Sequence, residues 1–350
     1  MRLSLRCTGL APQLRQRSLT VAAVLQRPSP PSQRLVDQAQ QQAAPTQLRP
    51  PPVRPPPSAR QEGRSPQRMA PPRPQQAAPQ PHRKVTLAVV GDVHSQWDAD
   101  SEAALAWLGA DVAVFVGDFG EEVVQLVERI AALPQPKVVC LGNHDAWFSL
   151  TPNGRRRYAR AMLQSSSLAA REAYTEGGST PAIARQLDAL GTDHIGYSSK
   201  RFPELGLTLV GARPFSKGGK QWSDVADFYE EHYGVGGHQD SALRILDVAL
   251  GAAEGDCRVV VAHNGPAGLG GRRHCICGVD WTEPEADFGD PDLQEALDMM
   301  HAQGVRVPLV LFGHMHSQLK GRGHRNMVEV DPATGTVYIN AAVLPSAANV

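Results

Sequence analysis

The sequence contains no run of about 18 consecutive apolar residues, the length that a membrane-spanning helix needs. Its first residues also lack the compact apolar segment of a secretory signal. We therefore expect a protein that neither spans nor contacts a membrane.

Cysteine is scarce as well, with 5 residues in 350, so a disulfide framework is not expected. The only unusual spacing is the CxC formed by Cys275 and Cys277. No further Cys or His stands beside this pair at zinc-finger spacing. A structural loop is therefore favoured, and a redox or metal-binding element is the alternative.

Residues 1–81 contain no lysine and only two acidic residues against twelve arginines, for a net charge of +10. They also hold 17 of the 29 prolines. Such a segment buries too little apolar area to offset its ordering entropy, so we predict disorder with some polyproline II. Residues 1–33 are rich in Arg and free of acids, which is typical of a transit peptide for the chloroplast or the mitochondrion. The alternative is a disordered tail without a targeting role.

Residues 82–350 have the composition of one folded domain and carry a net charge of −10. Residues 85–90, 112–116 and 138–141 are apolar runs that predict buried strands. Helical patterns at 98–108 and 121–133 lie between them. Two strand–helix–strand units in series predict a parallel α/β sheet, in which ligands bind at the carboxyl ends of the strands.

An insertion with Ala-rich helical stretches follows, at about residues 145–190. It contains Arg155, Arg156 and Arg157, which form either a solvated helix face or a phosphate-steering patch. Beyond it we predict a helix at 240–253, a hairpin joining 328–330 to 337–339, and strands at 207–210, 259–262 and 309–312. No chemistry is assigned to the acidic stretch 283–292, for which packing and loop solvation are the default expectations.

Seven side chains with oxygen or nitrogen donors lie at or just past the ends of apolar runs, often after Gly: Asp92, His94, Asp118, Asn143, His263, His314 and His316. Glycine allows a sharp turn and a close approach of the backbone to a site. This mixed set of ligands suits Mn, Fe or Zn better than Ca or Mg. Seven donors exceed the need of one ion, so we predict two divalent ions that share a bridging carboxylate.

The ordered motifs GDVH (91–94), GDFG (117–120), GNHD (142–145), AHN (262–264) and GHMH (313–316) resemble the calcineurin-like metallophosphoesterase superfamily. The resemblance implies a four-layer α/β/β/α sandwich with mixed sheets and parallel core strands. Features such as Ala146-Trp147 look like a subgroup found in cyanobacteria and plastid-bearing organisms, which favours the chloroplast. Members commonly continue beyond the last hairpin, so we expect the second sheet to be incomplete at the C-terminal end.

The resemblance also implies roles for individual residues. His144 would face the scissile phosphate and assist the leaving oxygen, with Asp145 orienting it, and Asn143 and His144 would contact the substrate. Asp92, His94 and His316 would bind a first ion, and Asn143, His263 and His314 a second ion. Asp118 would bridge the two ions.

The implied function is hydrolysis of a phosphorylated small molecule, either a mono- or a diester (EC 3.1 class), by attack of a metal-bound hydroxide on phosphorus. One alternative is a non-catalytic interaction module on the same fold, which degenerate ligands would favour, yet none is missing. The other is a nuclease, and the net charge of −10 over residues 82–350 argues against unaided binding of long nucleic acid.

Overall fold

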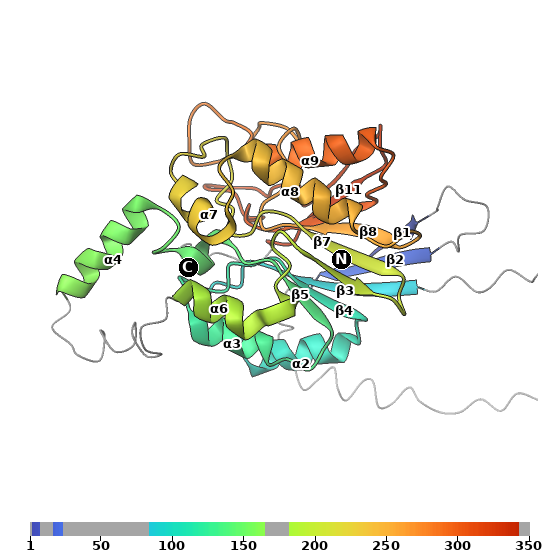
Figure 1. Ribbon diagram of the computed structural model, residues 1–350, viewed down its shortest axis with the longest axis horizontal. Helices are drawn as coiled ribbons and strands as arrows, with labels where there is room; N and C mark the ends of the chain where they lie inside the picture. The colour runs from blue at the N-terminus through green and yellow to red at the C-terminus, as the bar shows by residue number, and fades with distance from the viewer. Residues whose placement is uncertain (1, 8–16, 24–83, 165–181, 343–350) are drawn as a thin grey trace, which may run out of the picture. The chain divides into compact units, whose positions relative to one another are not determined.

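The computed structural model describes residues 2–7, 17–23, 84–164 and 182–342 (Figure 1). Its first sheet has the strand order β1-β2-β3-β4-β5. These strands are β1 (Arg2–Cys7), β2 (Arg17–Ala23), β3 (Lys84–Val90), β4 (Val112–Phe115) and β5 (Lys137–Val139). β3, β4 and β5 are mutually parallel, which confirms the predicted strand–helix–strand units.

The crossover helices of this sheet are α2 (Ala99–Leu108) and α3 (Val124–Ala131). Asp98 caps α2, because its side chain accepts a hydrogen bond from the amide of Ser101 at 2.9 Å. α3 begins later than predicted, because Glu122 adopts a left-handed backbone with φ of 59° that no helix can include.

The second sheet has the order β10-β11-β9-β8-β7-β6. Its strands are β6 (Ser199–Phe202), β7 (Leu207–Gly211), β8 (Cys257–Val261), β9 (Leu309–Phe312), β10 (Val328–Val330) and β11 (Val337–Asn340). The inner strands are parallel and both outer pairs are antiparallel, so the sheet is mixed. The antiparallel β10–β11 pair confirms the predicted hairpin.

Helices α7 (Ala226–Tyr233), α8 (His238–Leu250) and α9 (Pro291–Ala302) belong to the second half of the chain. α4 (Pro152–Gln164) and α6 (Ala182–Leu190) form the two ends of the insertion. Figure 1 shows α2, α3 and α6 along one side of the sheets and α8 and α9 along the other. β6, α7 and α9 were not predicted from the sequence. β6 and α7 are short, whereas the buried residues of α9 do recur at helical spacing: Leu293, Ala296, Leu297 and Met300.

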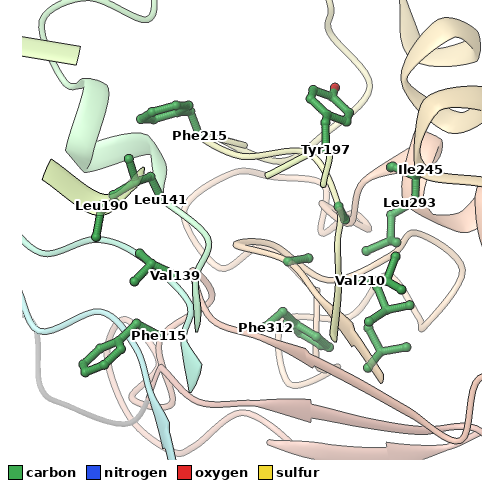
Figure 2. Packing of buried hydrophobic residues seen from close by; sticks show 14 of the residues in the cluster. Phe115, Val139, Leu141, Leu190, Tyr197, Val210, Phe215, Ile245, Leu293 and Phe312 are labelled. Atoms are coloured by element: carbon green, nitrogen blue, oxygen red, sulfur yellow. The ribbon is translucent and has the colours of Figure 1, made fainter. Parts of the chain in front are cut away.

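Two apolar cores separate these layers. One lies between the sheets, where side chains such as Leu87 and Val114 meet Leu209 and Leu311. The other includes the opposite sheet faces and the helices that cover them. In Figure 2, Val210 lies near Ile245 and Leu293, while Val139 and Leu141 lie near Leu190. The sheets thus stack face to face with helices outside, which confirms the expected four-layer α/β/β/α sandwich.

Two predictions from the sequence differ from the structure. Residues 2–7 and 17–23, placed in the disordered segment 1–81, form β1 and β2, and β2 pairs in parallel with β3. An open edge of β3 would leave a row of unpaired backbone groups, and a short apolar segment with strand propensity satisfies them. Residues 24–83 lie outside the described part of the chain, so disorder there, and the boundary at residue 82, remain predictions.

The acidic stretch 283–292 is also not simply a solvated loop. Asp290 and Asp292 are buried, and each forms an ion pair with the buried guanidinium of Arg213, at 2.9 and 2.8 Å. The surrounding acidic residues had suggested exposure, but a cation 77 positions or more away in the sequence compensates these two charges. Among the described helices, none has the length and apolar content needed to cross a bilayer.

Candidate metal centre

All seven predicted ligands lie at one end of the two sheets, just after β3, β4, β5, β8 and β9. Four of them, Asp92, His94, Asp118 and His314, have positive φ angles of 54°, 41°, 57° and 66°. This left-handed conformation is costly for residues other than Gly and is concentrated at functional sites. Hydrogen bonds between loops hold it in place: the amides of Asp92 and His94 donate to the carbonyls of Gly117 and Asp118, both at 3.0 Å.

Asp92, His94 and His316, the residues expected to hold the first ion, lie close together. The Nε2 atoms of His94 and His316 are 3.0 Å apart, and Asp92 Oδ1 lies 3.6 Å from His316 Nε2. Two imidazole nitrogens and a carboxylate oxygen that point to one spot form a donor set suited to a borderline divalent ion. Asp92 is buried and also accepts the amide of His314, which orients its carboxylate.

Asp118, the expected bridge, forms a second group with His263 and His314, two of the residues expected to hold the second ion. Asn143 belongs to it too, because its Oδ1 lies 3.0 Å from His263 Nε2. His263 donates from Nδ1 to the carbonyl of Val116 at 2.6 Å, which leaves Nε2 facing the group. His314 Nε2 is buried and has no hydrogen-bonding partner. A buried orphan nitrogen is costly in a protein interior, and a metal ion at this position would satisfy it.

Asp118 lies between the two groups. Its Oδ1 is 3.3 Å from His263 Nε2 in the second group, and its Oδ2 is 4.0 Å from His94 Nε2 in the first. One carboxylate thus presents a different oxygen to each group, which is the geometry that a bridging ligand requires.

The electrostatics of the centre favour an ionised bridge. Burial opposes ionisation of Asp118, but the charges of His263, His144 and His94 outweigh it and hold its pKa far below the usual range. The same carboxylate overcomes the burial of His263 and raises the pKa of that imidazole to about 10. Burial dominates at the other ligands: it lowers the pKa of His94 to about 4 and, with the Asp118 charge, raises that of Asp92.

Two glycines leave room for these side chains. A Cβ at Gly142 would collide with Asp118 Oδ1 and the ring of His263, which lies 2.5 Å from that position. A Cβ at Gly313 would collide with Asp92 Oδ2 and would lie 3.0 Å from a methyl group of Val116. These are close approaches of backbone to ligand, for which Gly is the residue that fits.

His144 lies at the partly exposed side of the centre. Its ring centroid is 4.7 Å from that of His94, and a ring nitrogen belongs to a group with His94 and Asp118. Its amide donates to Asp118 Oδ1 at 2.8 Å. His144 thus lies beside the predicted ligands, and its contact with a bound phosphate remains a prediction.

Asp145 has different partners from those predicted. Its buried carboxylate accepts the amides of Asp118, Phe119 and Gly142, at 2.9, 2.8 and 2.7 Å. These contacts orient the turn that carries the bridging Asp118, and none of them involves the ring of His144. The prediction that Asp145 orients His144 came from its neighbouring position in the sequence. The turn instead directs the two side chains apart.

The three arginines of the insertion also differ from one another. Arg155 is tied to Asp227 at 3.4 Å and to the carbonyl of Ser149 at 3.0 Å. Arg157 lies over the indole of Trp147, at 4.7 Å from the ring centroid. Arg156 is exposed on α4. The three residues therefore do not form a single phosphate-facing patch.

Several residues that hold the centre together were not predicted from the sequence. Glu122 accepts the amides of Phe148 and Ser149 at 2.8 and 3.1 Å, and Gln186 on α6 donates to the carbonyl of Asp145 at 2.8 Å. Asn340 donates to the carbonyl of Met315, between the two ligands of the last motif, at 2.7 Å. None of these residues stands at a spacing typical of metal ligands. The one unusual backbone angle among them is the φ of 59° at Glu122, and a backbone angle cannot be read from a sequence.

No curated protein matches the chain. A dimetal phosphatase from Danio rerio is 11% identical, with a TM-score of 0.40, and the match covers 74% of this chain and 88% of that one. A second crystal structure is 12% identical, with a TM-score of 0.38, and covers 73% and 89% of the two chains. The model of the calcineurin-like phosphoesterase family matches residues 85–318, which include every predicted ligand. On that match, the chain belongs to the calcineurin-like phosphoesterase family.

Proposed function

We propose that this protein is a dinuclear metal-dependent phosphoester hydrolase that acts on a small phosphorylated molecule. Asp92, His94 and His316 would hold one ion, Asn143, His263 and His314 the other, and Asp118 both. Two bound divalent ions, of Mn, Fe or Zn, would supply Lewis acidity to phosphoryl oxygens and make water nucleophilic at neutral pH.

The observation that carries the proposal is the position of Asp118 between two complete groups of donors. Its carboxylate oxygens are 3.3 Å from His263 Nε2 and 4.0 Å from His94 Nε2. Burial and left-handed backbone at the ligands give an arrangement that is costly without a bound cation. A protein that only binds a partner would not need these conformations, which raise the free energy of the folded state.

Exposure of the side chains indicates where a substrate would enter. Asp92, Asp118 and His263 are buried and form the floor of the centre. The side chains of His94 and His316 are 14% and 23% exposed, and His144 is also partly exposed. A phosphate that approaches from this side would meet His144, which could donate a proton to the leaving oxygen or stabilise its charge.

Hydrolysis of p-nitrophenyl phosphate and of its bis-ester, with Mn, Fe or Zn added to metal-free protein, tests the proposal. We expect two bound ions per chain and turnover. Asp118→Asn keeps the shape but removes the charge, so turnover should fall at least about a thousandfold, because several kcal/mol of charge stabilisation are lost.

Full turnover in Asp118→Asn would refute the dinuclear mechanism. Two bound ions without turnover on any ester would favour the interaction module. Cleavage of single-stranded oligonucleotides in preference to both esters would favour the nuclease.

We also propose a chloroplast location, with the mitochondrion as the alternative, and membership of the cyanobacterial and plastid subgroup. The Arg-rich, acid-free composition of residues 1–33 supports a transit peptide. Because β1 and β2 lie within this segment, cleavage after residue 23 would remove both strands. A fluorescent protein fused behind residues 1–81 should enter the organelle, and diffuse cytosolic fluorescence would contradict the proposal. N-terminal sequencing of the imported protein would show whether β2 is retained.

A further inference from the structure

Three side chains form a stack at the edge of the metal centre. The imidazole of His144 and the indole of Trp147 are nearly parallel, with ring centroids 4.4 Å apart and an interplanar angle of 16°. The guanidinium carbon of Arg157 lies 4.7 Å from the centroid of the same indole. His144 belongs to the 3-10 helix η1 (Asn143–Ala146), Trp147 follows it directly, and Arg157 comes from α4.

Both partners contact the indole, at 4.4 Å for the imidazole centroid and 4.7 Å for the guanidinium carbon. Stacking and cation–π attraction each favour such an arrangement. Trp147 therefore links the ring of His144 to α4.

The ring of His144 needs such support because no hydrogen bond from the described residues orients it at Nδ1. Its Nδ1 is buried and has no hydrogen-bonding partner. Asp145, the acidic neighbour that could have held this nitrogen, directs its carboxylate to three backbone amides instead. The imidazole stacks on Trp147 and makes an edge contact with His94, whose ring centroid lies 4.7 Å away.

The backbone on each side of the indole is held firmly. The amide of Glu122 donates to the carbonyl of His144 at 2.7 Å. The carboxylate of Glu122 accepts the amides of Phe148 and Ser149, at 2.8 and 3.1 Å. Trp147 is therefore a rigid support whose one remaining freedom, rotation of its side chain, is limited by Arg157.

We propose that Trp147 is a positioning residue for His144 and that Arg157 holds the indole in place from α4. The inference rests on the proposed function, in which His144 assists the leaving oxygen. It gives α4, at the start of the insertion, a role in keeping the imidazole ring in the orientation from which it can transfer a proton. If the imidazole ring rotates out of this orientation, it can no longer transfer a proton to the leaving oxygen. The predicted metal ligands keep their positions.

The orientation of the ring can be measured without turnover. In metal-free protein with 13C-labelled histidine, the Hε1 resonance of His144, assigned with His144→Gln, should lie upfield because it is close to the indole face. Trp147→Phe should keep most of this displacement, since a phenyl ring also stacks. Trp147→Leu should remove it, and Arg157→Gln should reduce it.

Kinetics then separate positioning from a general structural role. General acid catalysis contributes about 100-fold to 10,000-fold, so Trp147→Leu should lower kcat on p-nitrophenyl phosphate by roughly tenfold to a hundredfold. KM and the number of bound ions should not change, and Trp147→Phe should restore most of the activity. Arg160→Gln is the matched control for Arg157→Gln, because it removes the same charge from an exposed position on the same helix.

The outcomes distinguish this inference from the proposed function. An unshifted His144 resonance in the unmodified protein, or one that Trp147→Leu leaves in place, would overturn the positioning role even if turnover is high. Equal losses of kcat and of bound metal in Trp147→Leu would also overturn it. A shifted resonance in a protein without turnover would retain the stack and refute the phosphoesterase.

Discussion

At the scale of single residues, the metal centre depends on unfavourable backbone conformations that its neighbours stabilise. A left-handed conformation costs a residue other than Gly on the order of 1–3 kcal/mol, and Asp92, His94, Asp118 and His314 all adopt it. The carboxylate of Asp145 offsets part of this cost at Asp118 through its bonds to three amides. Small steric changes in these turns should therefore affect metal binding before they affect the fold.

Replacement of Gly142 by Ala tests this sensitivity. The new Cβ would collide with Asp118 and with the ring of His263, so the ligands of the second ion must move apart. We expect metal affinity to fall by about tenfold to a hundredfold, the usual effect of disturbing the support of a ligand. Calorimetric titration of metal-free protein measures it. Gly237→Ala is the control, since its Cβ would meet open space, and equal affinities in the two variants would contradict the steric argument.

His194 should make stability depend on pH. Its Nδ1 accepts the amide of Gly196 at 3.2 Å, its Nε2 is buried without a partner, and burial lowers the pKa to about 4. The unfolded chain, with an ordinary His pKa of about 6.5, binds a proton first as the pH falls. The contribution of neutral His194 to stability is therefore complete above pH 6.5 and is lost between about pH 6.5 and pH 4.

When the pH is lowered from 7.5 to 5, we expect protonation of His194 in the unfolded chain to lower the free energy of unfolding by at most about 2 kcal/mol. Urea unfolding of metal-free protein at both values measures the loss. His194→Asn keeps an acceptor for Gly196 but does not titrate, so it should lose correspondingly less stability over the same interval. Equal losses in the two proteins would show that His194 is not the responsible group.

At the scale of elements, the loops that follow the strands are fastened to one another by buried polar side chains. Arg325, in the loop between β9 and β10, donates to the carbonyls of His316, Arg273 and Cys275 at 3.1, 2.7 and 3.1 Å, and to that of Gly278. It thus joins the loop that contains Cys275 and Cys277, both free thiols, to the last metal-ligand motif. A loop that contacts His316 in this way helps to hold the position of this predicted ligand.

Arg325→Met should therefore destabilise the protein strongly. Four carbonyls would lose a charged donor, and buried groups left without partners cost about 1–3 kcal/mol each. We expect the free energy of unfolding in urea to fall by at least about 3 kcal/mol. Arg322→Met, three residues earlier and exposed, should change it little. Equal effects of the two substitutions would refute the fastening role of Arg325.

At the scale of the whole molecule, the metal centre joins two sheets. Asp92, His94, Asp118 and Asn143 follow strands of the first sheet, whereas His263, His314 and His316 follow strands of the second. Each group of ligands contains residues from both sheets. Bound ions would therefore cross-link the sheets in addition to the apolar layer that already joins them.

Metal binding should accordingly raise the melting temperature. A ligand that binds only the folded state at 100 times its Kd stabilises that state by about 2.7 kcal/mol. Scanning calorimetry with and without Mn or Zn should show the rise, and EDTA should reverse it. Asp118→Asn should respond much less, because the bridge is lost. An equal rise in that variant would show that the stabilising ion binds elsewhere.

Much of this architecture was predictable because it depends on local pattern. Runs of buried strand residues, followed by a donor side chain, often with Gly before it, placed β3, β4, β5, β8 and β9 and the seven predicted ligands at their ends. The elements that escaped prediction were the short β6 and α7, the helix α9, and β1 and β2 in a segment dominated by Arg and Pro. The apolar residues of α9 do recur at helical spacing, but the acidic residues before and among them obscured it. The other four depend on neighbours that are remote in the sequence, which a periodicity within a short window cannot represent.

By itself, the sequence determined which atoms could bind metal and that strand ends would present them, because side-chain chemistry and strand period are local properties. The tertiary structure alone decided how the charges and rings pair. It placed Asp145 under Asp118 rather than His144, buried Asp290 and Asp292 against Arg213, and stacked Trp147 on His144. Such contacts depend on the path that the backbone takes between distant segments. Loops and insertions have no sequence periodicity that predicts this path, so it is determined only when the chain packs.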